Sequence, residues 1–516
     1  MAHDATRTDI LSGSTALQGV PHFTTSHIVL AVLTVLLTSK WYSNYQKRVK
    51  VPGIGYSAWP ILSSWIAAFK FMRSPVELTR QGIEKHNRGF FRISTLQGEY
   101  VLIAQRDKIA EYVKAPDDVL GFQEAANDQQ QIEYTMGFGV AFRTYHTPVV
   151  RIQLTQSLKT HIPAMMDEMS LALDDMIGSP SEFQQFALYD IIAMAVARTS
   201  SRVFVGPILS RNKEYLENAI NYAAAVVISA ELVRMFPPWL KSILIKVAPV
   251  TWYRRRSLKF LRHIIQDRLD GKLDENGQKP DDLIQWLVDA APPIERTIPQ
   301  LAERIMALNV ASIHTTTMTL SGALYCLAAE PEKYTAELRA EVLEHAPDGN
   351  ITKDTLVKLV KMDSFLREAG RFNNAGLLSM QRNAKKKFTF SDGTVIPPGA
   401  KVGTPLLFVH RDPALYDNPE VFDGFRFSRL RENAETGQAI KYTMISTDPA
   451  YQLFGHGKHA CPGRFFAVTE MKLLFSLILL RYDLALEPGT GPKPIYVATM
   501  CLPDTKLKVL MKKAVS

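Results

Sequence analysis

The sequence has few cysteines, and those it has lie far apart. Cys326, Cys461 and Cys501 are the only three in 516 residues. A disulfide framework or a structural zinc site needs cysteines in pairs at short spacing, so neither is expected here. The chain therefore suits a reducing compartment, and each cysteine needs an explanation of its own.

Linkers, low-complexity tracts and internal repeats are also missing. The residues are 46% apolar and 22% charged, which is typical of a globular protein with a large core. Apolar residues recur at helical spacing over much of 60–366, for example in 155–177, 258–273, 303–329 and 332–346. Strand-like alternation is confined to short stretches such as 90–104 and the Asp392-Gly393 hairpin. We therefore expect one large domain, mainly α with small β-sheets.

Positive charge is in excess but is not concentrated. The net charge of +9 is dispersed along the chain, and no nucleic-acid-binding motif accompanies it. We expect no nucleic-acid partner. An anionic membrane surface or an acidic protein partner better suits the surplus.

One long hydrophobic run stands near the N-terminus, at "FTTSHIVLAVLTVLLTS". At a rise of about 1.5 Å per residue, residues 23–41 could cross a hydrocarbon core roughly 30 Å thick. A cleaved signal peptide is the alternative, but Asp4 and Asp9 precede the run in place of a basic region, and the residues after it form a poor cleavage site. We predict a retained transmembrane anchor at 23–41 behind a lumenal segment at 1–22.

Basic residues follow the run, and they predict its orientation. Lys40, Lys47, Arg48 and Lys50 place the main body on the cytoplasmic side of the membrane. The segment 42–59 is predicted to be a basic hinge that includes the turn "VPGIGYS", and 60–516 to be the catalytic domain.

Cys461 lies in the stretch "FGHGKHACPGRFFA", just before an apolar helical pattern. Pro462 is expected in the first turn of that helix, where proline is best tolerated. Helix N-termini favour a thiolate, which is the metal-binding form of cysteine. Gly457 and Gly463 would let a bulky or flat group approach the backbone. The alternative is that Cys461 is a small buried hydrophobic residue.

Three further features have ordinary explanations when taken alone. Glu368 and Arg371 stand three apart on a predicted helix, as many solvated ion pairs do. Arg426 lies between aromatic residues in "NPEVFDGFRF", as a surface arginine often does. The polar group "ASIHTT" at 311–316 interrupts an apolar helix, where hydroxyls commonly bond back to the preceding turn.

The order of these features, behind an N-terminal anchor, resembles the cytochrome P450 superfamily over essentially the whole chain. The likeness is to membrane-anchored fungal members, several of which oxidise terpenoids and other secondary metabolites. The resemblance implies a P450-like fold and haem b (iron-protoporphyrin IX). Cys461 then matches the thiolate ligand of the haem iron.

The resemblance also implies roles around the haem. Phe454 packs near the ligand loop, and Gly457 and Gly463 admit the porphyrin. His459 stands where much of the superfamily has an arginine that faces a haem propionate, and Arg151 and Arg382 are further propionate partners. A buried network that braces the ligand loop comprises Glu368, Arg371 and Arg426.

On the distal side, Thr315 matches the threonine that organises proton delivery to oxygen. Ser312 and His314 replace the usual glycine and acid, so that the proton route departs from the family pattern. The substrate pocket is expected from three segments: Leu308 and Ala311; Ala375, Gly376, Leu377 and Leu378; and Thr499, Met500, Cys501 and Leu502. These residues are mostly small or apolar, which suits a bulky hydrocarbon.

The implied function is a haem-thiolate monooxygenase of the endoplasmic reticulum membrane, single-pass with its catalytic domain in the cytoplasm. Its electrons would come from NADPH-cytochrome P450 reductase, with cytochrome b5 as an additional donor. Terpenoids rank first as substrates, with steroids or triterpenoids and fatty acids as alternatives. The departure at His314 leaves open a haem-thiolate isomerase or a peroxide-dependent enzyme, and a non-catalytic haem protein is the remaining alternative.

Overall fold

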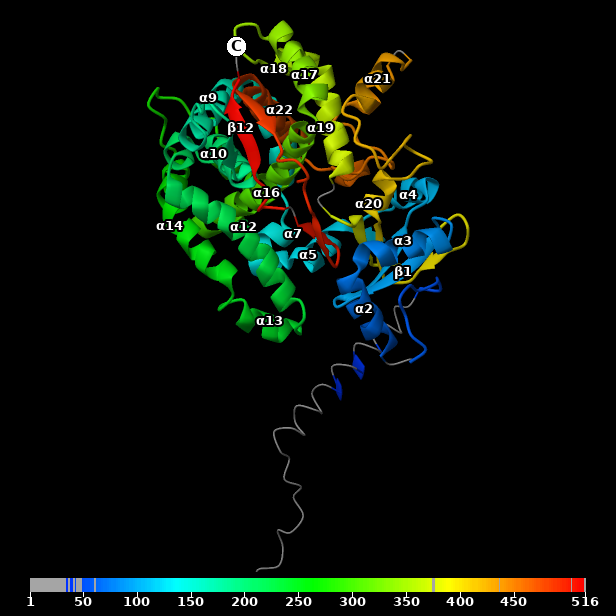
Figure 1. Ribbon diagram of the computed structural model, residues 1–516. Coiled ribbons are helices and arrows are strands. Elements are labelled where there is room, and N and C mark those ends of the chain that lie inside the picture. Colours follow the sequence, from blue (N-terminus) through cyan, green and yellow to red (C-terminus); the bar gives the residue numbers. More distant parts are fainter. Residues whose placement is uncertain are drawn as a thin grey trace, which may run out of the picture.

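The computed structural model describes residues 34–35, 38–39, 42, 49–59, 62–373, 376–435, 437–502 and 504–514. Helices gather in one large mass, and a smaller region carries most of the main sheet (Figure 1). The prediction of a mainly helical fold with small sheets is confirmed.

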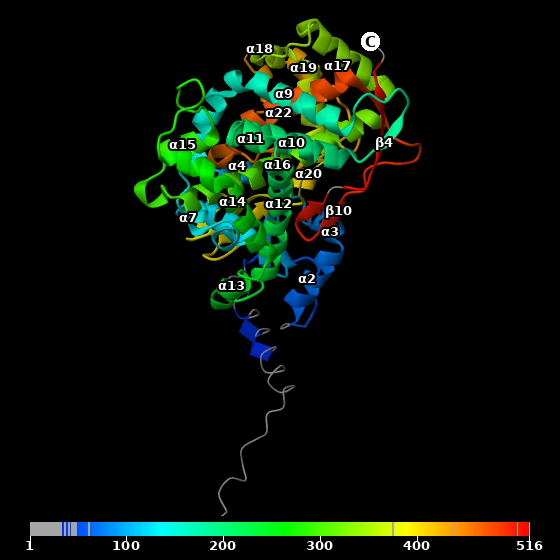
Figure 2. The same ribbon diagram turned by 90° about the vertical axis from the view of Figure 1, so that its left-hand side faces the viewer.

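The longest helix, α16 (Ile298–Ala329), runs through the interior in both views (Figures 1 and 2). It packs against α10 (Leu188–Phe204), α12 (Lys213–Val233), α14 (Pro249–Leu269) and α19 (Val360–Phe372). Most of its apolar residues, such as Leu301, Ile305 and Leu320, are buried. Its burial on several sides explains why polar residues within it are informative: a buried polar side chain needs a partner.

The remaining helices surround this core. They are α2 (Ser63–Arg73), α3 (Pro75–Lys85), α4 (Arg106–Tyr112), α5 (Phe122–Gln130), α6 (Ile132–Thr135), α7 (Phe138–Phe142), α8 (His146–Val149), α9 (Leu158–Met176), α11 (Pro207–Ser210), α13 (Pro238–Leu244), α15 (Leu283–Ala290), α17 (Pro331–His345), α18 (Lys353–Lys358), α20 (Leu406–His410), α21 (Arg426–Glu432) and α22 (Arg464–Arg481). One π-helix, η1 (Val150–Leu154), and three 3-10 helices, η2 (Pro293–Glu295), η3 (Ala439–Tyr442) and η4 (Gly457–His459), complete the helices described.

The main sheet has the strand order β1-β2-β8-β5-β3. Its strands are β1 (Phe90–Thr95), β2 (Gly98–Ile103), β3 (Leu120–Gly121), β5 (Ser379–Ala384) and β8 (Lys401–Thr404). The predicted hairpin at 90–104 is confirmed as the antiparallel pair β1-β2. Both strands are largely buried instead of alternating, because α2 packs on β1 and β8 pairs with β2 in parallel.

Three small sheets contain the other strands: β4 (Gln184–Phe186), β12 (Val509–Lys513) and β9 (Tyr482–Ala485); β6 (Phe388–Thr389) and β7 (Val395–Ile396); and β10 (Ile495–Val497) and β11 (Met500–Leu502). The pair β6-β7 confirms the hairpin predicted at Asp392-Gly393. Gly393 has a φ of 85°, a left-handed conformation that glycine adopts at no steric cost.

The predicted helices at 155–177, 258–273, 303–329 and 332–346 correspond to α9, α14, α16 and α17. One helix start differs from the prediction. The helix after Cys461 begins at Arg464, with Gly463 as its N-cap, so Pro462 precedes the helix and does not lie in its first turn.

The predicted lumenal segment at 1–22 lies outside the described residues. The predicted anchor at 23–41 does so too, except for residues 34, 35, 38 and 39. Of the predicted hinge at 42–59, residues 43–48 lie outside the described residues. Within the described part of the chain, α12 is the one helix long and apolar enough to cross a membrane. Its most apolar window is 56% buried against other parts of the protein. That burial is typical of a core helix.

Candidate functional site

Cys461 lies between η4 and α22, in a loop held by backbone hydrogen bonds. Its N–H donates to the Phe454 carbonyl at 2.8 Å, and its sulfur accepts the backbone N–H groups of Gly463 and Arg464. Burial raises the pKa of the Cys461 thiol, although the two N–H groups and the Arg464 charge oppose this shift. The helix N-terminus therefore does not by itself lower this pKa, contrary to expectation. A metal ion bound to the sulfur would deprotonate it.

Glycine is required at two turns of this loop. Gly455 and Gly457 have φ values of 67° and 75°. A Cβ atom at Gly457 would also approach Val113 Cγ1 to 2.4 Å, so the loop could not pack there with a side chain. Gly463 has no such strain, since its φ is −89° and a Cβ atom would meet Val150 at an ordinary 3.6 Å.

A cavity of about 510 Å³ opens above the Cys461 loop. Its wall includes Ala307, Leu308 and Ala311 from α16. Residues from α8, η1, β5, the residue before β5 and the loop itself complete much of the wall, among them His146, Thr147, Val150, Arg151, Leu378, Arg382, Phe454, His459 and Cys461. The structure thus brings together residues that are more than 300 positions apart in the sequence.

Several basic side chains line this cavity, among them Arg151, Arg382, Lys458 and His459. The Arg382 guanidinium lies over the Phe122 ring at 5.1 Å, and burial lowers its pKa. The His459 ring stacks on the same Phe122 ring, and the two ring centroids are 4.6 Å apart. The Nε2 atom of His459 is 2.6 Å from Asp117 Oδ1, and burial, only partly offset by this carboxylate, lowers the pKa of His459.

These features fit an iron-porphyrin. A sulfur atom is available as an axial ligand, apolar side chains from α16 and η1 suit a flat hydrophobic ring, and the basic groups suit its carboxylates. The fit rests on the donor types and on the mixed polarity of one cavity.

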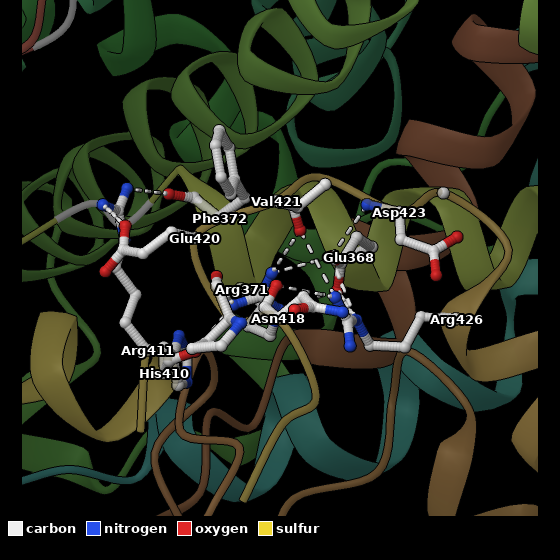
Figure 3. Close-up of polar contacts among 12 residues, drawn as sticks. Glu368, Arg371, Phe372, His410, Arg411, Asn418, Glu420, Val421, Asp423 and Arg426 are labelled. Atoms are coloured by element: carbon white, nitrogen blue, oxygen red, sulfur yellow. Dashed lines mark hydrogen bonds and ion pairs between the residues drawn. The ribbon is translucent and has the colours of Figure 1, made fainter. Parts of the chain in front are cut away.

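Beside the loop, Glu368 forms a buried network with two arginines (Figure 3). Arg371 donates to both oxygens of Glu368 at 2.7 Å, and neither side chain is exposed to solvent. Arg426 Nε lies 3.2 Å from each of the same oxygens. Arg371 Nη1 also donates to the carbonyls of His410 and Pro419 at 2.8 Å. The carboxylate therefore joins α19 to the long irregular segment after α20.

A second residue, His410, connects this network to the Cys461 loop. Its Nε2 accepts the backbone N–H of Gln452 at 2.9 Å, and its ring stacks on Tyr451 at 5.3 Å. Burial, followed by the charges of Arg371 and Arg367, lowers the pKa of His410 to about 3. The lowered pKa keeps the His410 ring uncharged at neutral pH, and an uncharged ring nitrogen can accept the hydrogen bond from Gln452. The sequence analysis did not identify His410, whose surroundings at "LLFVHRDP" show no motif.

The polar group of α16 is divided between two faces. Thr315 is exposed on the face that carries Ala311, and its Oγ1 donates to the Ala311 carbonyl at 2.6 Å. His314 points to the neighbouring helices, where Nε2 is 2.9 Å from the Ile220 carbonyl and Nδ1 is 3.2 Å from the Tyr189 hydroxyl. Ser312 Oγ lies 3.5 Å from the Asn309 carbonyl. The ring nitrogens of His314 are thus engaged between α10 and α12.

The predicted pocket segments 376–377 and 499–501 meet each other. Gly376 forms a β-bridge with Met500, and the Leu377 N–H donates to the Thr499 carbonyl at 3.0 Å. Leu377 and Cys501 are buried, and none of these five residues is among those that line the 510 Å³ cavity. Ala375 lies outside the described residues. Leu502 ends β11.

Comparisons with known proteins identify the family of the chain. The sequence profile of the cytochrome P450 family matches residues 58–511. Cytochrome P450 monooxygenase 151 of Postia placenta is 35% identical over 493 residues, which cover 93% of this chain and 97% of that protein. Ent-kaurene oxidase of Gibberella intermedia is 31% identical over 471 residues, covering 90% of this chain and 88% of that protein.

Solved structures give the same fold. A retinoic acid-bound cyanobacterial protein, CYP120A1, superposes with a TM-score of 0.68 at 18% identity and covers 90% of this chain and 100% of its own.

Proposed function

Because the chain belongs to the cytochrome P450 family of monooxygenases, we propose that it inserts one oxygen atom from dioxygen into an apolar substrate of the terpenoid class. The observation that carries this proposal is Cys461, a lone thiol at the base of a cavity with basic groups and an apolar wall. When bound there, haem b would supply the iron at which dioxygen is activated.

The proposed roles of the other residues follow from their positions. Arg151, Arg382 and His459 would hold the haem carboxylates, while Phe454, Gly457 and Gly463 would shape the loop around the ligand. Glu368, Arg371 and Arg426 would keep the loop in place. Thr315, exposed one turn after Ala311 on α16, would hold a proton donor near the reacting oxygen. His314 would act on Thr315 only indirectly, because its ring bonds elsewhere.

A terpenoid substrate is supported by two observations. Ent-kaurene oxidase is among the relatives, and its name states a terpenoid substrate for that protein. In this chain, Leu308, Ala311 and Leu378 give the cavity an apolar wall. Steroids, triterpenoids and fatty acids share this apolar chemistry, so the substrate class has to be measured.

The anchor proposed at 23–41 is supported by exposed apolar side chains at one end of the protein. Trp239 and Val247, in and after α13, are 69% and 84% exposed. Helices α13 and α2 lie at the same end in both views (Figures 1 and 2), and Ser39 lines a cavity there with Trp65 and Phe236. We propose that this end rests on the endoplasmic reticulum membrane, with residues 60–516 in the cytoplasm.

Electrons would come from NADPH-cytochrome P450 reductase, with cytochrome b5 as an additional donor. Lys458, an exposed cation of the Cys461 loop, would suit an acidic protein surface.

Replacing Cys461 with serine tests the proposal. The wild-type protein, reduced and treated with carbon monoxide, should give the spectrum of thiolate-ligated haem, and Cys461→Ser should not. An unchanged spectrum in the variant would refute the assignment. Titration of the wild type with terpenoids, steroids and fatty acids should then shift the ferric iron from low to high spin for the correct substrate class.

A further inference from the structure

A further buried ion pair joins α22, the helix that follows the Cys461 loop, to α19. Lys472 Nζ lies 2.7 Å from Asp363 Oδ1, and the two side chains are only 7% and 6% exposed. The same ammonium group donates to the Leu356 carbonyl at 2.9 Å and to the Leu359 carbonyl at 3.5 Å. An ammonium group has three N–H donors, and here each has an acceptor. Lys472 is therefore fixed at one place beside the junction of α18 and α19.

The carboxylate of this pair also contacts the segment that leads into the Cys461 loop. Asp363 Oδ2 accepts the backbone N–H of Met444 at 2.9 Å and lies 3.5 Å from Arg431 Nη1. Met444 is buried and precedes the loop in the sequence, whereas Lys472 follows it. One carboxylate thus holds the chain on both sides of the iron ligand.

The position of α22 determines what surrounds the sulfur. The helix is continuous from Arg464 to a point beyond Lys472, and a close-packed helix transmits a displacement along its length. At its first turn, the backbone N–H groups of Gly463 and Arg464 donate to the Cys461 sulfur. A shift of α22 relative to α19 would therefore change the hydrogen bonds of the sulfur.

We propose that Lys472 is a positioning residue for the iron ligand. Paired with Asp363, it fixes α22 along its axis, so that the start of the helix presents its backbone N–H groups to the Cys461 sulfur. Neither side chain of the pair lines the Cys461 cavity, so the role is indirect. A buried ion pair often adds no more stability than apolar residues of the same volume, but it can specify which groups meet. This inference rests on the proposed function, because it requires haem iron bound to Cys461.

Two substitutions that change the charge in opposite directions test this role. Lys472→Met removes the positive charge, and Asp363→Asn removes the negative charge. Hydrogen bonds to the sulfur of an iron ligand tune the reduction potential, and their loss lowers it because the sulfur then donates more charge to the iron. If the pair acts through the position of α22, the potential of the holoprotein should fall in both variants. If the pair acts only as two charges, the potential should move in opposite directions, and the inference is overturned.

The second readout is the persistence of thiolate ligation. The reduced carbon monoxide complex is kept in urea below the concentration that unfolds the chain, and the loss of its thiolate-ligated spectrum is timed. We expect this rate to rise roughly tenfold or more for Lys472→Met, because a buried carboxylate loses its charged partner. We expect a rise of about threefold for Asp363→Asn, which keeps an acceptor oxygen. If Lys472→Met does not accumulate as holoprotein, Lys472→Gln removes the same charge, keeps a donor group and takes its place in both measurements.

Arg268→Met is the matched control. Arg268 Nη2 lies 2.7 Å from Asp282 Oδ2, the side chains are 17% and 8% exposed, and the pair joins α14 to the N-cap of α15. Breaking this pair should make the protein easier to unfold in urea, as breaking the Lys472 pair should. The reduction potential and the rate of spectral loss should nevertheless stay at the wild-type values, because neither α14 nor α15 continues into the Cys461 loop.

The outcomes separate this inference from the function it rests on. If the wild type binds no haem, the proposed function fails. If the wild type gives the thiolate-ligated spectrum but both variants keep its reduction potential, Lys472 has no positioning role. A fall in the potential of Arg268→Met as large as that in Lys472→Met would assign the effect to lost stability, and the inference would again be overturned.

Discussion

The two sides of the Cys461 cavity differ in how firmly they are held. On the ligand side, Glu368, Arg371 and Arg426 are joined by paired hydrogen bonds in a buried site, and His410 continues the contacts to Gln452. On the opposite side, α16 contributes Ala311 to the wall, and Thr315 follows one turn later with a hydroxyl that bonds only within its own helix among the described contacts. The segment that leads into the Cys461 loop is thus held by several buried contacts, while the surface of α16 near Ala311 is sparsely bonded.

The largest effect should come from removing the shared carboxylate. Glu368→Ala leaves Arg371 and Arg426 buried without their counter-ion, which typically costs about 3–5 kcal/mol. We expect the variant to unfold more easily and to retain little haem. Haem content per chain and urea unfolding would measure this. A variant that kept full haem content and stability would show that the ligand side is not held by this network.

The second test uses the titration of His410. Its pKa is about 3 in the folded protein and ordinarily about 6.5, so between these values the unfolded chain binds more protons. This contribution to stability is present above about pH 6.5 and is lost on acidification, by up to about 1.4 kcal/mol per pH unit.

His410→Gln removes the titrating group but can still accept the Gln452 N–H. The difference in unfolding free energy between wild type and variant should therefore change between pH 7 and pH 5, with the wild type losing more stability. Urea unfolding at three pH values would show it. Parallel pH profiles would mean that His410 does not connect the network to the loop as a neutral ring.

A smaller effect is expected on the distal side. Tyr189→Phe removes the hydroxyl that meets His314 Nδ1, and a single hydrogen bond contributes about 0.5–1.5 kcal/mol. Haem content should not change, because neither residue lines the cavity. Thermal unfolding together with the carbon monoxide spectrum would check both statements. Loss of haem would show that the distal helix is as important for retention as the ligand side.

The smallest effect should come from an exposed ion pair near the network. Glu337 pairs with Lys361 on α19 at 2.6 Å, but the side chains are 52% and 42% exposed. Glu337→Gln should therefore change stability by no more than about 1 kcal/mol. A loss comparable to that of Glu368→Ala would mean that burial does not explain the difference between the two glutamates.

Several residues of the ligand side could be singled out in the sequence because they have recognisable spacing. The Glu368-x-x-Arg371 pair and the glycines around Cys461 could be found without coordinates. His410 could not, since its importance depends on a contact between segments far apart in the chain. The direction of the Cys461 pKa shift was also missed, because burial in a folded loop outweighs the local effect of the helix N-terminus.

The β-bridge between Gly376 and Met500 has a consequence for how such an enzyme can diversify. Two short segments from distant parts of the chain touch there through backbone atoms, and neither takes part in the Glu368 network. Because the bridged residues do not line the 510 Å³ cavity either, substitutions confined to this bridge should leave both the cavity wall and cofactor retention unchanged. Libraries for directed evolution are therefore better concentrated on Leu308, Ala311 and Leu378, which do line the cavity.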